Sequence, residues 1–239
     1  MGLFIAAAIT TALALCGAAI LFKHATDRRA LLLAFLIALP LQPLMFYALR
    51  LPVDGLLRST FGIAAPWVTI VSLFYAPLTE EPAKWLTAAV PAVRRAIVEN
   101  PIGVALAVGA GFGIGEIWFL THALIRSPSY PDLPFWMFGG FLIERLAVCF
   151  LHGALLVPPF YALASGRSFL LGGVVGMVMH FLLNFPIYLA SMNVFGLGEN
   201  WKPLLMLWVL LFVVLGAVLV LALSRRPPAA PRAQVTEQP

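Results

Sequence analysis

Four stretches of the sequence carry ionisable or amide side chains of the types that activate water or bind a metal. They are the segment 79–84 (Thr-Glu-Glu-Pro-Ala-Lys), Glu116, His152, and the pair His180 and Asn184. Two histidines and a carboxylate can hold a divalent metal such as zinc with one position left for water. A further glutamate could take a proton from that water, and an amide could donate to a developing oxyanion. This set of residue types suits the hydrolysis of an amide bond.

All four stretches lie inside apolar segments. Of the 239 residues, 62% are hydrophobic and only 10% are charged, against about 25% charged in an average soluble domain. Too few polar side chains remain to cover the surface of a soluble fold, and a disordered chain requires low hydrophobicity. The composition therefore predicts an all-α polytopic membrane protein, with the lipid bilayer as one partner.

Seven apolar segments are long enough to cross a membrane, which takes about 20 residues. We place them at 2–22, 30–49, 62–90, 101–124, 135–164, 169–191 and 203–224. Only short loops remain between them. We therefore predict a single integral membrane domain over 1–224, with the polar motifs at 75–188 and a disordered tail over 225–239.

The net charge of +5 is explained by topology. Most basic residues fall in the first, third and fifth loops and in the tail: Lys23, Arg28, Arg29, Arg94, Arg95, Arg167, Arg225, Arg226 and Arg232. The even loops hold only Arg50, Arg58, Arg126 and Lys202. The positive-inside rule then puts the N-terminus outside and the C-terminus, with its tail, in the cytoplasm. No nucleic-acid partner is needed to account for the charge.

Depth in the membrane sorts the buried ionisable residues. At about 1.5 Å rise per residue, Glu80 lies roughly 21 Å from Arg94 and Glu116 about 23 Å from Pro101. On the same scale His152 is about 21 Å from Gly166, and His180 about 18 Å from Ser168. Four helices thus bring ionisable groups to one depth. By contrast, Glu144, Arg145 and His122 come out near the outer interface, where we expect them to snorkel or to pair at the headgroups.

Local spacing supports a site. Lys84 is three residues from Glu81 and four from Glu80, so we expect it to be the counter-ion of one of them. Adjacent glutamates in a helix point about 100° apart, so one should face the chemistry and the other should pair or orient. Pro77 and Pro82 predict a broken helix, which is tolerated at membrane depth only where it lines a cavity.

Glycines at four-residue spacing let a neighbouring helix approach closely. Gly109 and Gly113 share a face with Phe112 and Glu116. A second such face has four members in steps of four: Gly172, Gly176, His180 and Asn184. We expect each pair of glycines to bring in a partner helix for the polar residues to meet.

The motifs Glu80-Glu81-x-x-Lys84, Phe112-x-x-x-Glu116, His152 and His180-x-x-x-Asn184, in this order, resemble those of the PrsW family of intramembrane proteases. That family is related to the type II CAAX prenyl endopeptidases, which carry Glu-Glu-x-x-x-Arg and Phe-x-x-x-His patterns. The lysine at the shorter spacing and the glutamate after the phenylalanine both favour the PrsW branch. The resemblance covers residues 75–188, about half of the chain.

The resemblance implies an integral protease of a prokaryotic inner or plasma membrane. Its substrate would be a membrane-anchored protein, as anti-sigma factors are for the family. Glu80 or Glu81 would activate water, with Asn184 as a further catalytic group. His152 and His180, with Glu116, would bind zinc or another divalent metal, or position the water directly, and Lys84 and Phe112 would support the site. The resemblance leaves open whether such sites hold zinc or work as metal-independent glutamate peptidases.

One rival reading is a proton- or ion-coupled transporter. Intramembrane carboxylates and histidines are what such a protein uses, and broken helices suit it too. Against it, no second half of the sequence mirrors the Glu80-Glu81 segment. A catalytically inactive descendant of a protease is a further alternative, although every motif residue is present.

Overall fold

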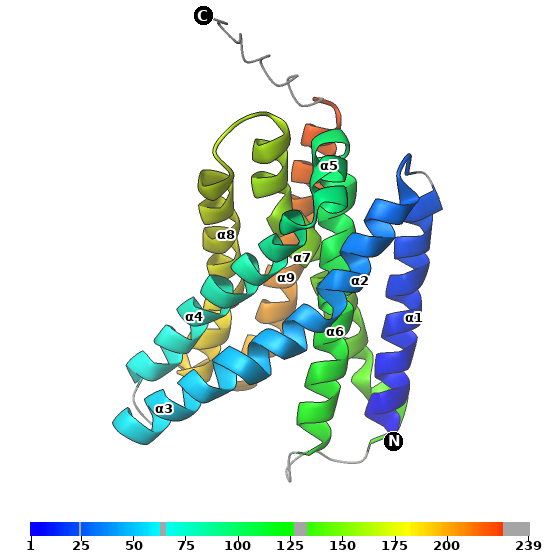
Figure 1. Cartoon of the computed structure of the whole chain (residues 1–239). Coiled ribbons are helices and arrows are strands. Elements are labelled where there is room, and N and C mark those ends of the chain that lie inside the picture. Colours follow the sequence, from blue (N-terminus) through cyan, green and yellow to red (C-terminus); the bar gives the residue numbers. More distant parts are fainter. Residues whose placement is uncertain (24, 63–65, 127–132, 227–239) are drawn as a thin grey trace, which may run out of the picture.

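The computed structural model describes residues 1–23, 25–62, 66–126 and 133–226, and these ranges form an all-helical bundle without a β-strand (Figure 1). Most of the predicted disordered tail, residues 227–239, lies outside the described residues.

Nine α-helices make up the described chain: α1 (Gly2–Lys23), α2 (Arg28–Met45), α3 (Leu51–Phe61), α4 (Pro66–Trp85), α5 (Pro91–Glu99), α6 (Pro101–Ile125), α7 (Gly139–Ala164), α8 (Phe169–Ser191) and α9 (Trp201–Ser224). A π-helical turn, η1 (Phe46–Arg50), joins α2 directly to α3. The described 3-10 turns are η2 (Leu86–Ala89), η3 (Phe135–Phe138), η4 (Val194–Gly196) and η5 (Gly198–Asn200). Side-chain caps start three of the long helices, since Asp27 accepts from the Ala30 amide, Asn100 from the Gly103 amide and Ser168 from the Leu171 amide.

Six helical segments of the described chain are long and apolar enough to cross a membrane: Gly2–Lys23, Arg28–Phe61, Pro101–Ile125, Phe135–Ala164, Phe169–Ser191 and Gly198–Ser224. The fold is that of a polytopic integral membrane protein. The third predicted span, residues 62–90, contains α4, which is helical but is not among the six. Its C-terminal part carries Glu80, Glu81 and Lys84, which make it less apolar than the others.

The second predicted span was expected to end at residue 49, but the helix continues through Phe61. Pro52 does not stop it, because the chain passes through the π-helical turn η1 just before this proline and continues directly into α3. Arg50 therefore lies inside a continuous helical segment, and not in a loop as its sequence context suggested. In Figure 1, α3 and α4 run side by side, obliquely to α1 and α6.

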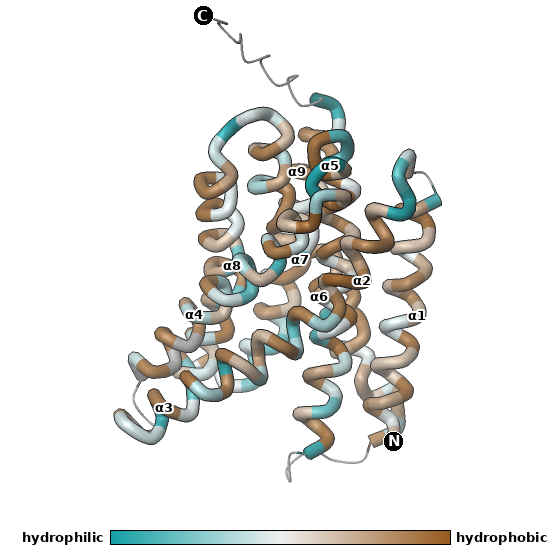
Figure 2. Tube along the Cα trace, in the orientation of Figure 1, coloured by the Kyte–Doolittle hydropathy of each residue, from teal (hydrophilic) through white to brown (hydrophobic). Residues whose placement is uncertain are grey.

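The start of α1 and the end of α9 lie at opposite ends of the bundle (Figure 1). Figure 2 shows hydrophilic residues on α5, at the α1–α2 turn and just after α9, all at the end of the bundle where α9 finishes. The basic odd-numbered loops and the tail were predicted to lie on the same side of the membrane, and these hydrophilic segments do lie at the same end of the bundle. The assignment of that end to the cytoplasm stays a prediction from the positive-inside rule.

The central helix α6 packs most extensively against α2 and α7. A side-chain carbon on Gly109 or Gly113 would overlap with Gly153 or Cys149 of α7. On another face, a side-chain carbon on Gly111 would overlap with the carbonyl oxygen of Phe35 in α2. The expectation that glycines bring partner helices into close contact is confirmed here, and on two faces of α6 instead of one.

Helix α8 meets α7 in the same way. Gly172 lies against the backbone of Pro158 and Pro159, and Gly176 against the carbonyl oxygen of Leu155. His180 follows one turn later and is buried. The glycines of α8 therefore bring His180 close to α7 and α4.

The predicted interruption of the Glu80-Glu81 helix is wrong. Helix α4 runs unbroken from Pro66 to Trp85 with Pro77 and Pro82 inside it, and its α-helical geometry ends only where η2 begins. Each proline removes one backbone donor. The hydroxyl of Thr79 donates to the carbonyl oxygens of Tyr75 and Ala76 next to the first proline.

Candidate active site

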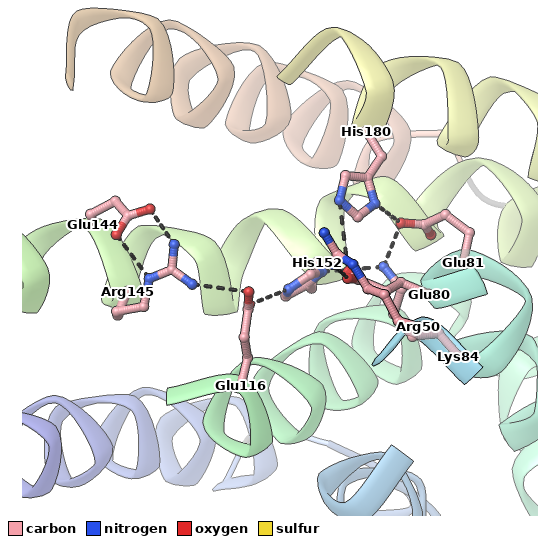
Figure 3. A network of polar contacts seen from close by, with 9 residues as sticks. All are labelled: Arg50, Glu80, Glu81, Lys84, Glu116, Glu144, Arg145, His152 and His180. Atoms are coloured by element: carbon pink, nitrogen blue, oxygen red, sulfur yellow. Dashed lines mark hydrogen bonds and ion pairs between the residues drawn. The ribbon is translucent and has the colours of Figure 1, made fainter. Parts of the chain in front are cut away.

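Nine ionisable side chains from five elements form one chain of polar contacts in the middle of the bundle (Figure 3). They are Arg50 of η1, Glu80, Glu81 and Lys84 of α4, Glu116 of α6, Glu144, Arg145 and His152 of α7, and His180 of α8. We call this set the polar network. Acids and bases alternate along most of it, so each charge has a partner of opposite sign or a hydrogen bond, as burial in a membrane requires.

Glu81 lies at the centre of the network, and its side chain is only 1% exposed. Its Oε1 accepts from the ammonium of Lys84 at 2.6 Å and from Nδ1 of His180 at 2.6 Å. A histidine that donates through Nδ1 keeps Nε2 as an acceptor when the ring is neutral. Glu81 therefore fixes the orientation of the His180 ring and directs Nε2 away from itself.

Lys84 joins the two halves of the network. Its side chain is fully buried. Besides Glu81, its ammonium contacts Nδ1 of His152 at 3.3 Å and lies 5.3 Å from the centre of the Phe112 ring. The Phe112 ring also packs edge-on against His152 at 4.9 Å between centres. The supporting positions predicted for Lys84 and Phe112 are thus both in contact with His152.

His152 and Glu116 form the next link. Nε2 of His152 lies 2.9 Å from Oε2 of Glu116, and the other carboxylate oxygen of Glu116 lies 3.0 Å from Nη1 of Arg145. The guanidinium of Arg145 also pairs with Glu144. Side chains of helices lean toward the helix N-terminus, so Glu116 and His152, on antiparallel α6 and α7, lean toward each other.

Glu80 lies at the other end of the network. Its Oε1 accepts from Nη1 of Arg50 at 3.0 Å. Its Oε2 lies 3.8 Å from Nε2 of His180. That separation is too long for a direct hydrogen bond, and a polar gap of this size suits a bridging water.

A cavity of about 700 Å³ lies beside the network. Five predicted site residues line it: Glu80, Glu116, His152, His180 and Asn184. Glu81 and Lys84 are not among its lining residues and lie behind Glu80 and His180. The two adjacent glutamates therefore have different surroundings, with Glu80 at the cavity and Glu81 paired behind it.

The expectation that Arg145 pairs at the headgroups, apart from the other groups, is wrong. Gly109 faces Gly153 and Gly113 faces Cys149. Because α6 and α7 are antiparallel, four residues further along α6 and four residues back along α7 bring Ile117 level with Arg145, which therefore lies next to Glu116. The depths were counted from Pro101 and Gly166 as if these were level, whereas this register puts Pro101 level with Tyr161, five residues before Gly166. His122, which was grouped with Arg145, is exposed and lies outside the network, 3.3 Å from the hydroxyl of Tyr47.

The prediction of the site missed the two polar residues that line the cavity from α2 and η1, Gln42 and Arg50. Arg50 was counted as a loop residue, and Gln42 was not singled out. Both lie on one side of α2 and η1 with Phe46 between them, at steps of four residues. That spacing was visible in the sequence as a polar stripe continuing past the expected end of the helix.

Two of the three predicted metal ligands, His152 and Glu116, are paired with other side chains in this arrangement. Within the described ranges, no group of three or more His, Cys, Asp or Glu side chains is placed to hold an ion. Both ring nitrogens of His152 and both carboxylate oxygens of Glu116 are already engaged. Binding of a metal by His152, Glu116 and His180 would require these contacts to be exchanged, and no catalytic step below depends on a metal.

Comparisons of the chain with models of protein families, with curated proteins and with solved structures found no match. The likeness to the PrsW family therefore rests on the four motifs alone.

Proposed function

We propose that the protein is an intramembrane endopeptidase that hydrolyses a peptide bond of a membrane-anchored protein. The observation that carries this proposal is the gap of 3.8 Å between Oε2 of Glu80 and Nε2 of His180 at the wall of the cavity. Two acceptors at that separation can each take one hydrogen of the same water molecule. The lone pairs of the water oxygen then point away from both, toward a carbonyl carbon in the cavity.

In the proposed reaction the water oxygen attacks the peptide carbonyl carbon, and Glu80 takes a proton from the water. The carbonyl oxygen becomes an oxyanion, which the amide of Asn184 stabilises from α8. Glu80 then returns its proton to the peptide nitrogen, and the C–N bond breaks. The products are a carboxylic acid and an amine, the acid passes its remaining proton to the amine to give a carboxylate and an ammonium group, and Glu80 is left as it began.

The remaining network residues act by positioning. Glu81 holds His180 through Nδ1, so that Nε2 is presented to the water. Arg50 holds Oε1 of Glu80 at 3.0 Å, which leaves Oε2 for the water. Lys84, His152, Glu116 and Arg145 keep these groups paired at a depth where an unpaired charge would cost several kcal/mol or more.

The proposal extends to the motif resemblance. We include three further points in it: the protein is a member of the PrsW family, it lies in a prokaryotic inner or plasma membrane, and its substrate is a membrane-anchored protein such as an anti-sigma factor. Support comes from the ordered motif residues meeting around one cavity of a polytopic membrane protein.

Cleavage can be tested without knowing the substrate. The wild-type protein, Glu80→Gln and Glu99→Gln are reconstituted with membranes of a bacterial expression strain in water enriched in ¹⁸O. New protein termini are then mapped by mass spectrometry. Glu99 is an exposed residue of α5 outside the network, so it is the matched control. We expect new termini within apolar segments, carrying one ¹⁸O, for wild type and Glu99→Gln only. Identical termini for all three proteins would overturn the proposal.

A proton-coupled transporter is the second candidate, because an unbroken series of titratable contacts from Glu116 to Glu81 is what proton movement through a membrane protein requires. Liposomes that contain the purified protein and a pH-sensitive dye distinguish the two. A transporter would acidify the lumen under an imposed gradient, and Glu116→Gln would abolish this. The endopeptidase proposal predicts no flux above that of empty liposomes.

A further inference from the structure

We propose that Gln42, Phe46 and Arg50 form a substrate-binding wall that holds an unwound stretch of a transmembrane polypeptide by its backbone. This inference rests on the proposed function and names residues that no motif contains. All three side chains line the 700 Å³ cavity, from the side of α2 and η1.

Gln42 is the first observation. It is only 3% exposed, it lines the cavity, and its Oε1 has no hydrogen-bond partner among the described residues. A buried polar atom without a partner is costly, and in a native protein such an atom usually has a functional reason or a missing partner. An acceptor at the cavity wall suits a donor that arrives with a ligand.

Arg50 is the second observation. One of its donors, Nη1, holds Glu80, whereas its Nε is buried and unpartnered within the described chain. Its guanidinium carbon lies 5.6 Å from the centre of the Phe46 ring, which restrains the side chain. Arg50 therefore has a donor to spare beside the residue proposed to activate water.

A peptide substrate needs such groups. The carbonyls of a transmembrane helix are paired within the helix, so water can attack one only after local unwinding. Unwinding frees backbone N–H and C=O groups, and each group left unpaired in hydrocarbon costs several kcal/mol. Oε1 of Gln42 can accept from a freed N–H, and Nε of Arg50 can donate to a freed C=O.

The spacing fits an extended chain. Eight residues of helix separate Gln42 from Arg50, roughly 12 Å at about 1.5 Å per residue. Extended chain advances about 3.3 Å per residue, so the two groups would meet positions three to four residues apart. The wall faces apolar residues of α9, among them Leu205, Met206 and Val209, which line the same cavity and suit apolar side chains.

Other polar groups of the cavity are less available. Glu116 and His152 are engaged with each other, and each has a further partner on its remaining polar atom. His180 is held by Glu81 and faces Glu80. Nη1 of Arg145, which also lines the cavity and makes no hydrogen bond to a described residue, is held in an ion pair with Glu116. Within the part of the chain that the structure describes, Gln42 and Arg50 thus have buried atoms in the cavity wall with neither a hydrogen bond nor an ion pair, and these atoms can take up a backbone.

Binding is tested separately from cleavage, in Glu80→Gln protein embedded in lipid nanodiscs. The probes are two fluorescent Leu/Ala transmembrane peptides with a benzophenone at the centre, one with a central Gly-Pro pair that breaks the helix and one fully helical. We expect the broken peptide to cross-link to residues of α2 and η1, and the helical peptide to cross-link much less. Gln42→Met should weaken binding of the broken peptide roughly tenfold, the effect of about one buried hydrogen bond.

Thr121→Val is the control, because Thr121 is buried and polar but does not line this cavity. If Gln42→Met is not monodisperse, Gln42→Ala is measured in its place, and the preference of the Glu80→Gln protein for the broken peptide is an independent readout. Equal binding of the two peptides, or unchanged binding in the Gln42 variants, would overturn the wall and leave the proposed hydrolysis untouched. Hydrolysis that survives in Glu80→Gln would overturn the proposed function and leave the wall untouched.

Discussion

Nη1 of Arg145 lies 3.0 Å from Oε1 of Glu116, although the two residues belong to different helices and Arg145 lies in the N-terminal half of α7. The contact attaches Arg145 to the same network that ends at Glu80. Arg145 does not touch the proposed water, but it helps to position it, because each contact between Arg145 and His180 restrains the next side chain along the network.

Loss of Arg145 should lower cleavage as severely as loss of His152. Arg145→Met leaves Glu116 without its cation, so Glu116 and then His152 shift, and a displacement of about 1 Å at a catalytic group can cost a hundredfold in rate. The rate is measured from the appearance of the ¹⁸O-labelled termini. Arg126→Met, an exposed arginine at the end of α6, should leave it unchanged. Arg145→Lys should restore part of the activity, and an equal loss in both Arg145 variants would argue against a positioning role.

The pair of Lys84 and Glu81 should show strong thermodynamic coupling. Lys84→Met strands the buried charge of Glu81, and removing one member of a buried ion pair costs about 3–5 kcal/mol. The double variant Lys84→Met with Glu81→Gln should lose less than the sum of the two single variants. Stability is measured by denaturant unfolding in detergent micelles. Strictly additive losses would mean that the contact at 2.6 Å contributes no coupling.

Gly109→Ala should destabilise the bundle by about 1–3 kcal/mol, because the added carbon overlaps with the backbone of Gly153 and forces α6 and α7 apart. Gly17→Ala is the matched control, since a side-chain carbon there meets nothing within 4 Å. Alanine is the better helix former, so this control should be neutral or slightly stabilising. The two variants are compared by thermal unfolding in the same detergent. A lower midpoint for Gly17→Ala than for Gly109→Ala would contradict the packing described for α6.

The sequence pattern predicts a divalent metal, whereas the hydrogen bonds of His152 and Glu116 leave no three donors free. We expect purified protein to contain no stoichiometric zinc and to keep its activity after dialysis against a chelator. Elemental analysis by mass spectrometry decides this, with His180→Ala analysed in parallel. One zinc per chain in the wild type that is lost in His180→Ala would support the metal centre, and would require Lys84 or Glu116 to release its partner.

The sequence predicted much of this fold because the relevant signals are local. Composition and apolar run length predict helices that cross a membrane, and glycines at four-residue spacing predict close contact of the kind found between Gly109 and Gly153. The placement of Glu116, His152 and His180 around one cavity follows from counting residues along each helix, since those residues lie several turns from the helix ends.

The sequence did not predict the parts that depend on how helices are shifted against each other. Arg145 was misplaced because the register of α6 on α7 depends on how the two helices pack. Counting residues from the helix ends does not reveal this register. Arg50 was missed because the apolar segment was expected to end at residue 49, whereas the chain continues through a π-helical turn into α3. The helix of Glu81 was expected to break at Pro82, but α4 continues as a helix through Pro82 to Trp85.

The continuous helical segment Arg28–Phe61 has 34 residues, about 51 Å at 1.5 Å per residue. The hydrocarbon core of a bilayer is about 30 Å thick. Upright, this segment would not fit, and in Figure 1 its α3 half lies obliquely. Beside α3 and α4 the hydrophobic length of the protein therefore differs from the thickness of the bilayer. The mismatch is relieved when the protein tilts or the bilayer changes its local thickness, at a cost of a fraction of a kcal/mol per Å of mismatch. Arg50 lies in this segment and Glu80 in its neighbour α4, so bilayer thickness should change the relative position of these two site residues. Cleavage rates in vesicles of increasing acyl-chain length should pass through a maximum. Rates independent of chain length would show that the tilt of the oblique segment does not affect catalysis.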